Sequence, residues 1–171
     1  LCRINGDDLL PDGMGFADYA TLLPSLEDAG ADAFDIQPGG FVSRQPAAHT
    51  SVPAGAFLGV AAALTRVSRV PVCAGTRLGD AETAARAVAE GHADLVSVGT
   101  ALIADAEWSR KAVEGRYEDI RPCILCGDCW NDLMDRRQPI ACRLDREAAT
   151  DDHTPTHRST HTVTVVGGGL S

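Results

Sequence analysis

Short apolar runs alternate along the chain with longer segments in which apolar residues recur every three or four positions. Such runs predict buried strands, and the periodic segments predict amphipathic helices. Gly30, Gly91 and Gly115 follow three of these segments, where glycine commonly ends a helix. Predicted strands cover residues 1–5, 33–37, 70–74 and 95–98, and predicted helices cover residues 16–29, 53–68, 80–90 and 101–114. The pattern therefore predicts four consecutive strand–helix units.

Strands that alternate with helices in this way are typical of a parallel sheet covered by helices, an α/β fold. A complete eight-stranded (β/α)8 TIM barrel needs about 250 residues, and this chain has 171. We therefore interpret residues 1–120 as the second half of such a barrel. Because the chain begins at Leu1 and stops at Ser171 within a glycine motif, we expect it to be an internal fragment. Half a barrel leaves open sheet edges, so we expect the isolated chain to associate and to be inactive.

A ladder of cysteines follows the last strand–helix unit. Cys123, Cys126 and Cys129 lie at every third position, and Cys142 follows 13 residues later. Four thiolates are the full ligand set of a four-iron cluster, and three closely spaced cysteines allow one loop to reach three irons. Zinc is the main alternative, although zinc sites usually divide their ligands between two separate Cys-x2-Cys pairs. Disulfides would need an oxidising compartment, which nothing else in the sequence indicates.

The composition changes again after the cysteine segment, which we assign to residues 121–147 with a short helix over residues 130–137. Residues 148–162 are polar and read as a linker. Three histidines in the linker, His153, His157 and His161, have helical spacing, but Pro155 interrupts the run and makes a metal site the weaker interpretation.

The last residues, 163–171, predict a strand followed by three glycines. Gly167 and Gly169 match the opening of Gly-x-Gly-x-x-Gly, in which glycines let the backbone approach a pyrophosphate at the start of a helix. The motif is incomplete, and glycines after a strand often form only a turn. Its position after a linker favours the start of a nucleotide-binding domain.

Charge and hydropathy exclude several classes of function. The formal net charge is −9, and the 15 lysines and arginines are scattered, which disfavours binding to nucleic acid or to an anionic membrane. The longest apolar stretch, residues 57–64, is too short to cross a bilayer. We expect a cytoplasmic protein with a small-molecule substrate, in which Cys2 and Cys73 are inert core thiols.

The order of these features resembles the iron–sulfur branch of the Old Yellow Enzyme family, which contains 2,4-dienoyl-CoA reductase and trimethylamine dehydrogenase. The resemblance is carried by Gly-Arg-Tyr-Glu-Asp-Ile-Arg-Pro-Cys-Ile-Leu-Cys-Gly-Asp-Cys at residues 115–129 and by Val-Val-Gly-Gly-Gly at residues 165–169. It implies an FMN-binding barrel, a 4Fe–4S cluster that accepts electrons from FMN, and a second region for FAD or NAD(P)H. An electron-transfer protein and a second copy of the chain are further candidate partners.

The resemblance also implies roles for individual residues. Arg3 matches a strand-borne arginine beside the flavin pyrimidine, where a guanidinium would stabilise negative charge on the reduced ring. Gly75 and Gly99 match two loops whose backbone amides bind the FMN phosphate, and Arg77 matches an arginine of the first loop. Thr100 stands where the family usually has arginine.

The catalytic acid or base cannot be carried over in the same way. Phe41 occupies the position of a substrate-side histidine in dienoyl-CoA reductases, and His49 lies nearby in a predicted loop. We therefore expect an oxidoreductase that acts on an activated C=C bond or on an amine C–N bond. The alternative is a cluster-binding electron-transfer or structural module without catalytic activity, which would not retain flavin.

Overall fold

The computed structural model describes residues 1–40, 43 and 50–145. Phe41, His49, the linker at residues 148–162 and the strand and glycines at residues 163–171, with Gly167 and Gly169, lie outside the described residues. In chain order the elements are β1 (Cys2–Ile4), α1 (Phe16–Asp28), β2 (Phe34–Ile36), α2 (Leu58–Thr65), β3 (Val72–Ala74), α3 (Ala81–Ala89), β4 (Leu95–Val96), α4 (Thr100–Ala104), α5 (Trp108–Val113), the 3-10 helix η1 (Tyr117–Asp119) and α6 (Asp128–Met134).

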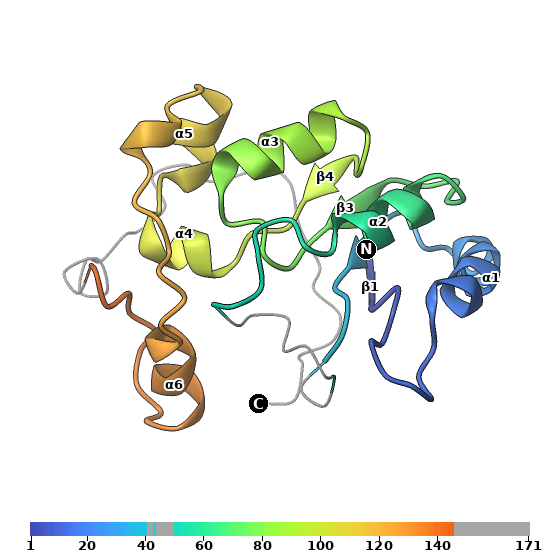
Figure 1. The fold of residues 1–171 in the computed structure, drawn as a ribbon, viewed down its shortest axis with the longest axis horizontal. Coiled ribbons are helices and arrows are strands. Elements are labelled where there is room, and N and C mark those ends of the chain that lie inside the picture. The colour runs from blue at the N-terminus through green and yellow to red at the C-terminus, as the bar shows by residue number, and fades with distance from the viewer. Residues whose placement is uncertain (41–42, 44–49, 146–171) are drawn as a thin grey trace.

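A four-stranded sheet forms the centre of the described structure, with strand order β1-β2-β3-β4 (Figure 1). All three strand pairs are parallel, and each connection passes through a helix or helices. Arg3, Asp35, Cys73 and Leu95 are register partners and form one row across the sheet. The predicted parallel α/β fold is therefore confirmed.

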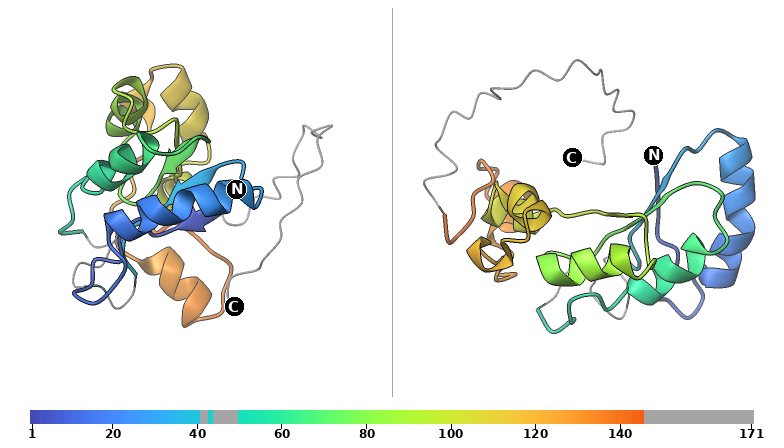
Figure 2. Two further views of the ribbon diagram at one scale, coloured as in Figure 1. Left: turned by 90° about the vertical axis from the view of Figure 1, so that its right-hand side faces the viewer. Right: turned by 90° about the horizontal axis from the view of Figure 1, so that it is seen from above.

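The main core lies between one face of the sheet and helices α1 and α2. Leu23 of α1 and Leu64 of α2 are fully buried against Phe34, Ile36 and neighbouring strand residues. Because successive strand side chains point to opposite faces, the row that contains Asp35 lies on the other face. Figure 2 shows α1, α2 and α3 lying beside the sheet when the molecule is viewed along two further directions.

A second, smaller core joins α3, α4 and α5. It contains Ala84, Ala101 and Trp108, and the Trp108 indole donates a hydrogen bond to the Gly79 carbonyl over 2.9 Å. Cys123, the first residue of the cysteine ladder, packs against this cluster. The second core therefore supports the start of the cysteine segment.

Three predicted helices have different bounds in the structure. The helix expected over residues 101–114 is divided into α4 and α5, because Asp105 adopts an extended conformation and turns its carboxylate inward. The helix expected from residue 53 starts at Leu58, since Gly55 takes a positive φ of 70° in the preceding turn. The helix expected over residues 130–137 is α6, which begins earlier, at Asp128, and ends at Met134. It follows directly after Gly127, which has a positive φ of 76°.

The cysteine segment leaves the sheet region, and α6 projects away from the strands (Figure 1). Within residues 1–40, 43 and 50–145, no helix is both long enough and apolar enough to span a membrane.

Candidate functional site

A cavity of about 610 Å³ opens at the carboxyl ends of the four strands. Catalytic and cofactor sites of parallel α/β barrels occupy this end of the sheet. Four of the predicted flavin-site residues, Arg3, Arg77, Gly99 and Thr100, line the cavity together. Its other walls are Gln37, Ala54, Thr76, Leu78, Gly79, Asp80, Ser97, Val98, Ala101, Pro122, Cys123 and Leu125.

Arg3 reaches the cavity from β1 and is held by a buried carboxylate on β2. Its Nε and Nη2 atoms each lie 2.8 Å from Oδ2 of Asp35. The Arg3 side chain is 66% exposed, whereas that of Asp35 is 5% exposed. The arrangement fixes the direction of a cation that is open to the cavity and partnered from behind.

Gln37 connects the ends of three strands. Its amide nitrogen donates to Oδ1 of Asp35 over 3.2 Å and lies 3.5 Å from the Ser97 hydroxyl, and its amide oxygen accepts a 2.8 Å hydrogen bond from Thr76. Because both the nitrogen and the oxygen of the amide form hydrogen bonds, these contacts determine which way the amide group points. Gln37 therefore forms part of the cavity floor with a set conformation.

Gly75 does not line the cavity, and the structure gives it a different local role. A Cβ atom at this position would lie 1.7 Å from the amide nitrogen of Gln37, so only glycine leaves room for that side chain. The Gly75 N–H donates to the Ile36 carbonyl over 3.0 Å within the sheet. Its expected contact with a flavin phosphate stays a prediction.

The two residues after Gly75 adopt an unusual backbone conformation. Thr76 and Arg77 have φ angles of 64° and 59°, in the left-handed region that most residues avoid. Arg77 is held by hydrogen bonds from its Nε to the Val52 carbonyl, over 2.6 Å, and from the Gly55 N–H to its own carbonyl, over 2.9 Å. Strain of this kind is concentrated at functional sites.

A second pocket, of about 390 Å³, is lined by all four cysteines of the ladder. The remaining lining residues are Thr100, Ile103, Ile124, Leu125, Gly127, Trp130 and Arg143. None of the six cysteines of the chain, all of which the structure describes, forms a disulfide. Among the residues that the structure describes, no three His, Cys, Asp or Glu side chains converge closely enough to hold a single metal ion.

The loop between Cys123 and Cys129 wraps around this pocket because two of its residues take positive φ angles. These residues are Leu125, at 55°, and Gly127, at 76°. The Leu125 N–H donates a hydrogen bond to Sγ of Cys123 over 3.4 Å, and hydrogen bonds of this kind orient metal ligands. Burial raises the pKa of Cys129; a hydrogen bond with the Trp130 backbone opposes this rise, and Cys123 and Cys126 add to it. A metal would therefore have to displace the proton of this thiol.

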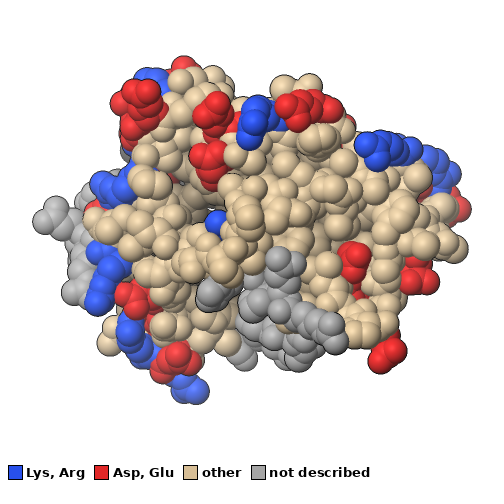
Figure 3. All heavy atoms as spheres, in the orientation of Figure 1, with Lys and Arg blue, Asp and Glu red and all other residues tan. Residues whose placement is uncertain are grey.

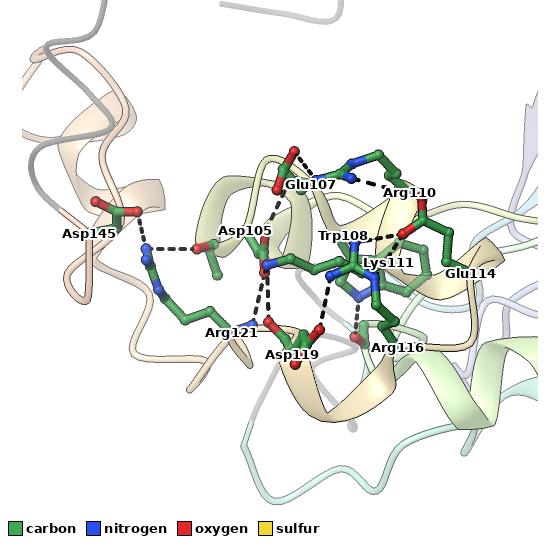
Figure 4. A network of polar contacts seen from close by, with 12 residues as sticks. Asp105, Glu107, Trp108, Arg110, Lys111, Glu114, Arg116, Asp119, Arg121 and Asp145 are labelled. Atoms are coloured by element: carbon green, nitrogen blue, oxygen red, sulfur yellow. Dashed lines mark hydrogen bonds and ion pairs between the residues drawn. The ribbon is translucent and has the colours of Figure 1, made fainter.

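A buried carboxylate fastens the cysteine segment to α4 and α5 (Figure 4). Asp105 accepts hydrogen bonds from Lys111 Nζ over 2.6 Å, from the Arg121 N–H over 2.9 Å and from the Glu107 N–H over 3.0 Å. Burial is the largest single influence on Asp105 and raises its pKa, but the hydrogen bonds together outweigh it and lower the pKa. The Arg121 side chain also pairs with Asp145, beyond the fourth cysteine.

Residues 1–119 match the model of the NADH:flavin oxidoreductase / NADH oxidase family. This match covers the whole sheet, the cavity residues on its strands and the three helices around the second core. The chain belongs to this family. The match confirms the family expected from the sequence, and the family supports FMN binding.

The chain is also similar to individual proteins over almost its whole length. A metal reductase of Desulforamulus reducens is 28% identical over 174 residues, which cover 100% of this chain and 26% of the relative. An N,N-dimethylglycine/sarcosine dehydrogenase of Chromohalobacter salexigens is 29% identical and is matched over 98% of this chain and 26% of its own length. The chain thus spans about a quarter of these relatives.

The structure of a 2-naphthoyl-CoA reductase in complex with 2-naphthoyl-CoA has a similar fold. The two structures superimpose with a TM-score of 0.78 at 27% sequence identity. The matched region covers 86% of this chain and 23% of the reductase chain.

Several polar residues at the cavity were not predicted from the sequence, among them Gln37 and Ser97, which line it, and Asp35, which lies behind Arg3. Asp35 and Gln37 interrupt an otherwise apolar strand at every second position, which is a detectable sign of a functional face. Ser97 offers no such sign, because one hydroxyl after a short strand is common. The contribution of Leu125 to both pockets depends on its backbone conformation and has no signal in the sequence.

Proposed function

We propose that the chain is part of a flavin- and iron–sulfur-dependent oxidoreductase. In this proposal residues 1–120 are the second half of an FMN-binding barrel, and residues 121–147 hold a 4Fe–4S cluster. Residues 148–162 are a linker, and residues 163–171 begin a domain for FAD or NAD(P)H.

The main support is the contact between the two pockets. Thr100, Cys123 and Leu125 line both the cavity at the strand ends and the pocket of the four cysteines. A cofactor in the first pocket and one in the second would therefore be separated by one layer of residues. The cysteines surround a volume, as a cubane requires, because each cysteine of such a cluster binds a different iron.

The residues of the cavity suit a flavin phosphate and an electron-rich ring. FMN, when bound, supplies the transfer of one or two electrons. Arg77 and Thr100 offer a cation and a hydroxyl to a phosphate, and Arg3 offers a cation to negative charge on the pyrimidine edge. The contacts of Arg3 with Asp35, and of Arg77 with Val52, hold these groups in place before a ligand arrives.

Relatives support two classes of substrate, an activated C=C bond and an amine C–N bond. The proteins similar to this chain include a 2-naphthoyl-CoA reductase and an N,N-dimethylglycine/sarcosine dehydrogenase. In either case electrons would pass between the substrate, FMN, the cluster and a nicotinamide or an electron-transfer protein. We propose a small molecule of one of these two classes as substrate.

The cluster is tested by replacing one ladder cysteine in the intact protein, purified without oxygen. Cys126→Ala removes one of four ligands, so we expect iron and acid-labile sulfide to be lost together. Iron, sulfide and zinc are measured on the same sample, and visible absorption and electron paramagnetic resonance report the cluster.

Cys2→Ser is the matched control, because Cys2 lies in β1 outside the cysteine pocket. This variant should keep full iron and sulfide. Recovery of one zinc per chain in place of iron would contradict the proposal that the four cysteines bind a 4Fe–4S cluster. Absence of FMN at stoichiometric occupancy would favour a cluster-binding module without catalytic activity.

A further inference from the structure

We propose that Asp35 lowers the reduction potential of the bound flavin by offsetting the charge of Arg3. The inference rests on the proposed function, since it requires FMN in the cavity. It identifies a residue that tunes the flavin and predicts that the pair makes the reduced flavin a stronger electron donor than Arg3 alone would.

The geometry places the two charges in contact on the face of the sheet that carries the cavity residues. Arg3 and Asp35 are register partners on β1 and β2, and both N–H groups of Arg3 meet the same oxygen, Oδ2. The guanidinium therefore cannot reach the cavity without its counter-ion, which lies directly behind it.

The second oxygen of Asp35 is also partnered by a neutral group. Gln37 donates to Oδ1, so no second cation neutralises the carboxylate through this contact. Asp35 is buried and screened little by water, and interactions between charges are stronger where water is excluded. The net charge of the Arg3–Asp35 pair is therefore close to zero, whereas Arg3 alone would present a full positive charge to the cavity.

Both members of the pair affect the pKa of a neighbouring thiol, Cys73. Burial raises the pKa of Cys73 to about 11; Asp35 adds to this rise and Arg3 opposes it. The opposing influences on one side chain of the same row indicate that each charge acts locally and in part cancels the other.

The consequence follows from the charge of the reduced flavin. A cation near the pyrimidine edge stabilises the reduced ring and raises the potential, and a carboxylate nearby does the reverse. A lower potential favours the reduction of a substrate over the oxidation of one. The Arg3–Asp35 pair therefore favours the reductive branch of the proposed substrates, an activated C=C bond.

Three variants in the intact, FMN-loaded protein separate charge from positioning: Arg3→Gln, Asp35→Asn and the double variant. We measure the midpoint potential of the flavin and the ratio of its dissociation constants in the oxidised and reduced states. Asp35→Asn should bind reduced flavin about tenfold more tightly relative to oxidised flavin, which is about 30 mV upward for a two-electron couple. Arg3→Gln should shift the ratio in the opposite direction.

The double variant decides between the two roles. If the charges offset one another, removing both returns the potential to near the wild-type value. If Asp35 only holds Arg3 in place, the double variant matches Arg3→Gln and Asp35→Asn does not raise the potential; either result would overturn the proposal. The double variant leaves no unpaired ion at the buried position, so it remains informative if Arg3→Gln alone, which leaves the buried Asp35 carboxylate without its cation, does not fold.

Glu27→Gln is the matched control, because the Glu27–Arg69 pair has nearly the same exposures, 4% and 60%, but does not line the cavity. This variant should leave the potential unchanged although the net charge changes equally. Failure of the wild-type protein to bind FMN would instead refute the proposed function, and so the two ideas fail separately.

Discussion

Gly75 and Gln37 share one small volume at the end of β2 and β3. The amide of Gln37 occupies the space that a side chain at position 75 would need, and its three polar partners prevent it from moving without loss of hydrogen bonds. At the scale of single residues, the shape of the cavity floor therefore depends on the smallest side chain in the sequence.

Gly75→Ala should destabilise the folded chain by about 1–3 kcal/mol, because the new methyl group forces Gln37 out of its hydrogen bonds. Chemical denaturation followed by circular dichroism measures the change. Adding Gln37→Ala to this variant should recover part of the loss, since it removes the clashing amide. Gly59→Ala in α2 is the control: nothing lies within 4 Å of its Cβ position, and a gain of about 0.5–1 kcal/mol is expected.

The sequence predicted which residues would meet at this site better than it predicted how they would act. Arg3, Arg77, Gly99 and Thr100 were expected there and line one cavity. The partner of Arg3 was not predicted, because register between strands decides which residue of β2 lies beside it. For a residue that acts through a cross-strand contact, the only signal in the sequence is a polar residue at every second position of a strand.

At the scale of elements, Asp105 ends α4 and starts a network that reaches the cysteine segment (Figure 4). Periodicity alone predicted one helix over residues 101–114, since apolar positions continue through the break. The sequence could not show that this aspartate is buried, and the burial of its carboxylate makes it a junction between α5 and the residues before Cys123.

Asp105→Asn should cost about 1–3 kcal/mol at neutral pH, since it leaves the half-buried Lys111 without its counter-ion. The folded pKa of Asp105 is lowered, so its stabilising effect is fully present above the ordinary aspartate pKa of about 3.9. That effect is lost as the pH falls through the lower, folded pKa. The difference between wild type and variant in free energy of unfolding should therefore shrink in acid.

Glu107→Gln is the control for this prediction, because Glu107 and its partner Arg110 are both 55% exposed. Its effect should be within about 0.5 kcal/mol. A difference between Asp105→Asn and wild type that stays constant from neutral pH to below pH ~3 would show that the carboxylate charge contributes nothing to stability.

For the whole molecule, the order and direction of the four strands could be predicted from the alternation of strands and helices. Parallel strands need crossovers, and crossovers of this length place consecutive strands side by side.

The charged side chains of the molecule are not gathered in one patch: acidic and basic side chains are interspersed on the face in Figure 3. The position of α6 was not predictable, since few core contacts fix it.

The two tryptophans of the chain lie in its two different parts. Trp108 is 5% exposed in the second core, and Trp130 is 49% exposed and lines the cysteine pocket. Emission from Trp108→Phe should be red-shifted and should fall when iron and sulfide are added, because the remaining indole lies beside the cysteines. Emission from Trp130→Phe should be blue-shifted and change less. Equal quenching in both variants would place the bound iron elsewhere. If the proposed cluster forms beside the cysteines, Trp130 is a fluorescent reporter of that pocket and Trp108 is a reference within the same scaffold.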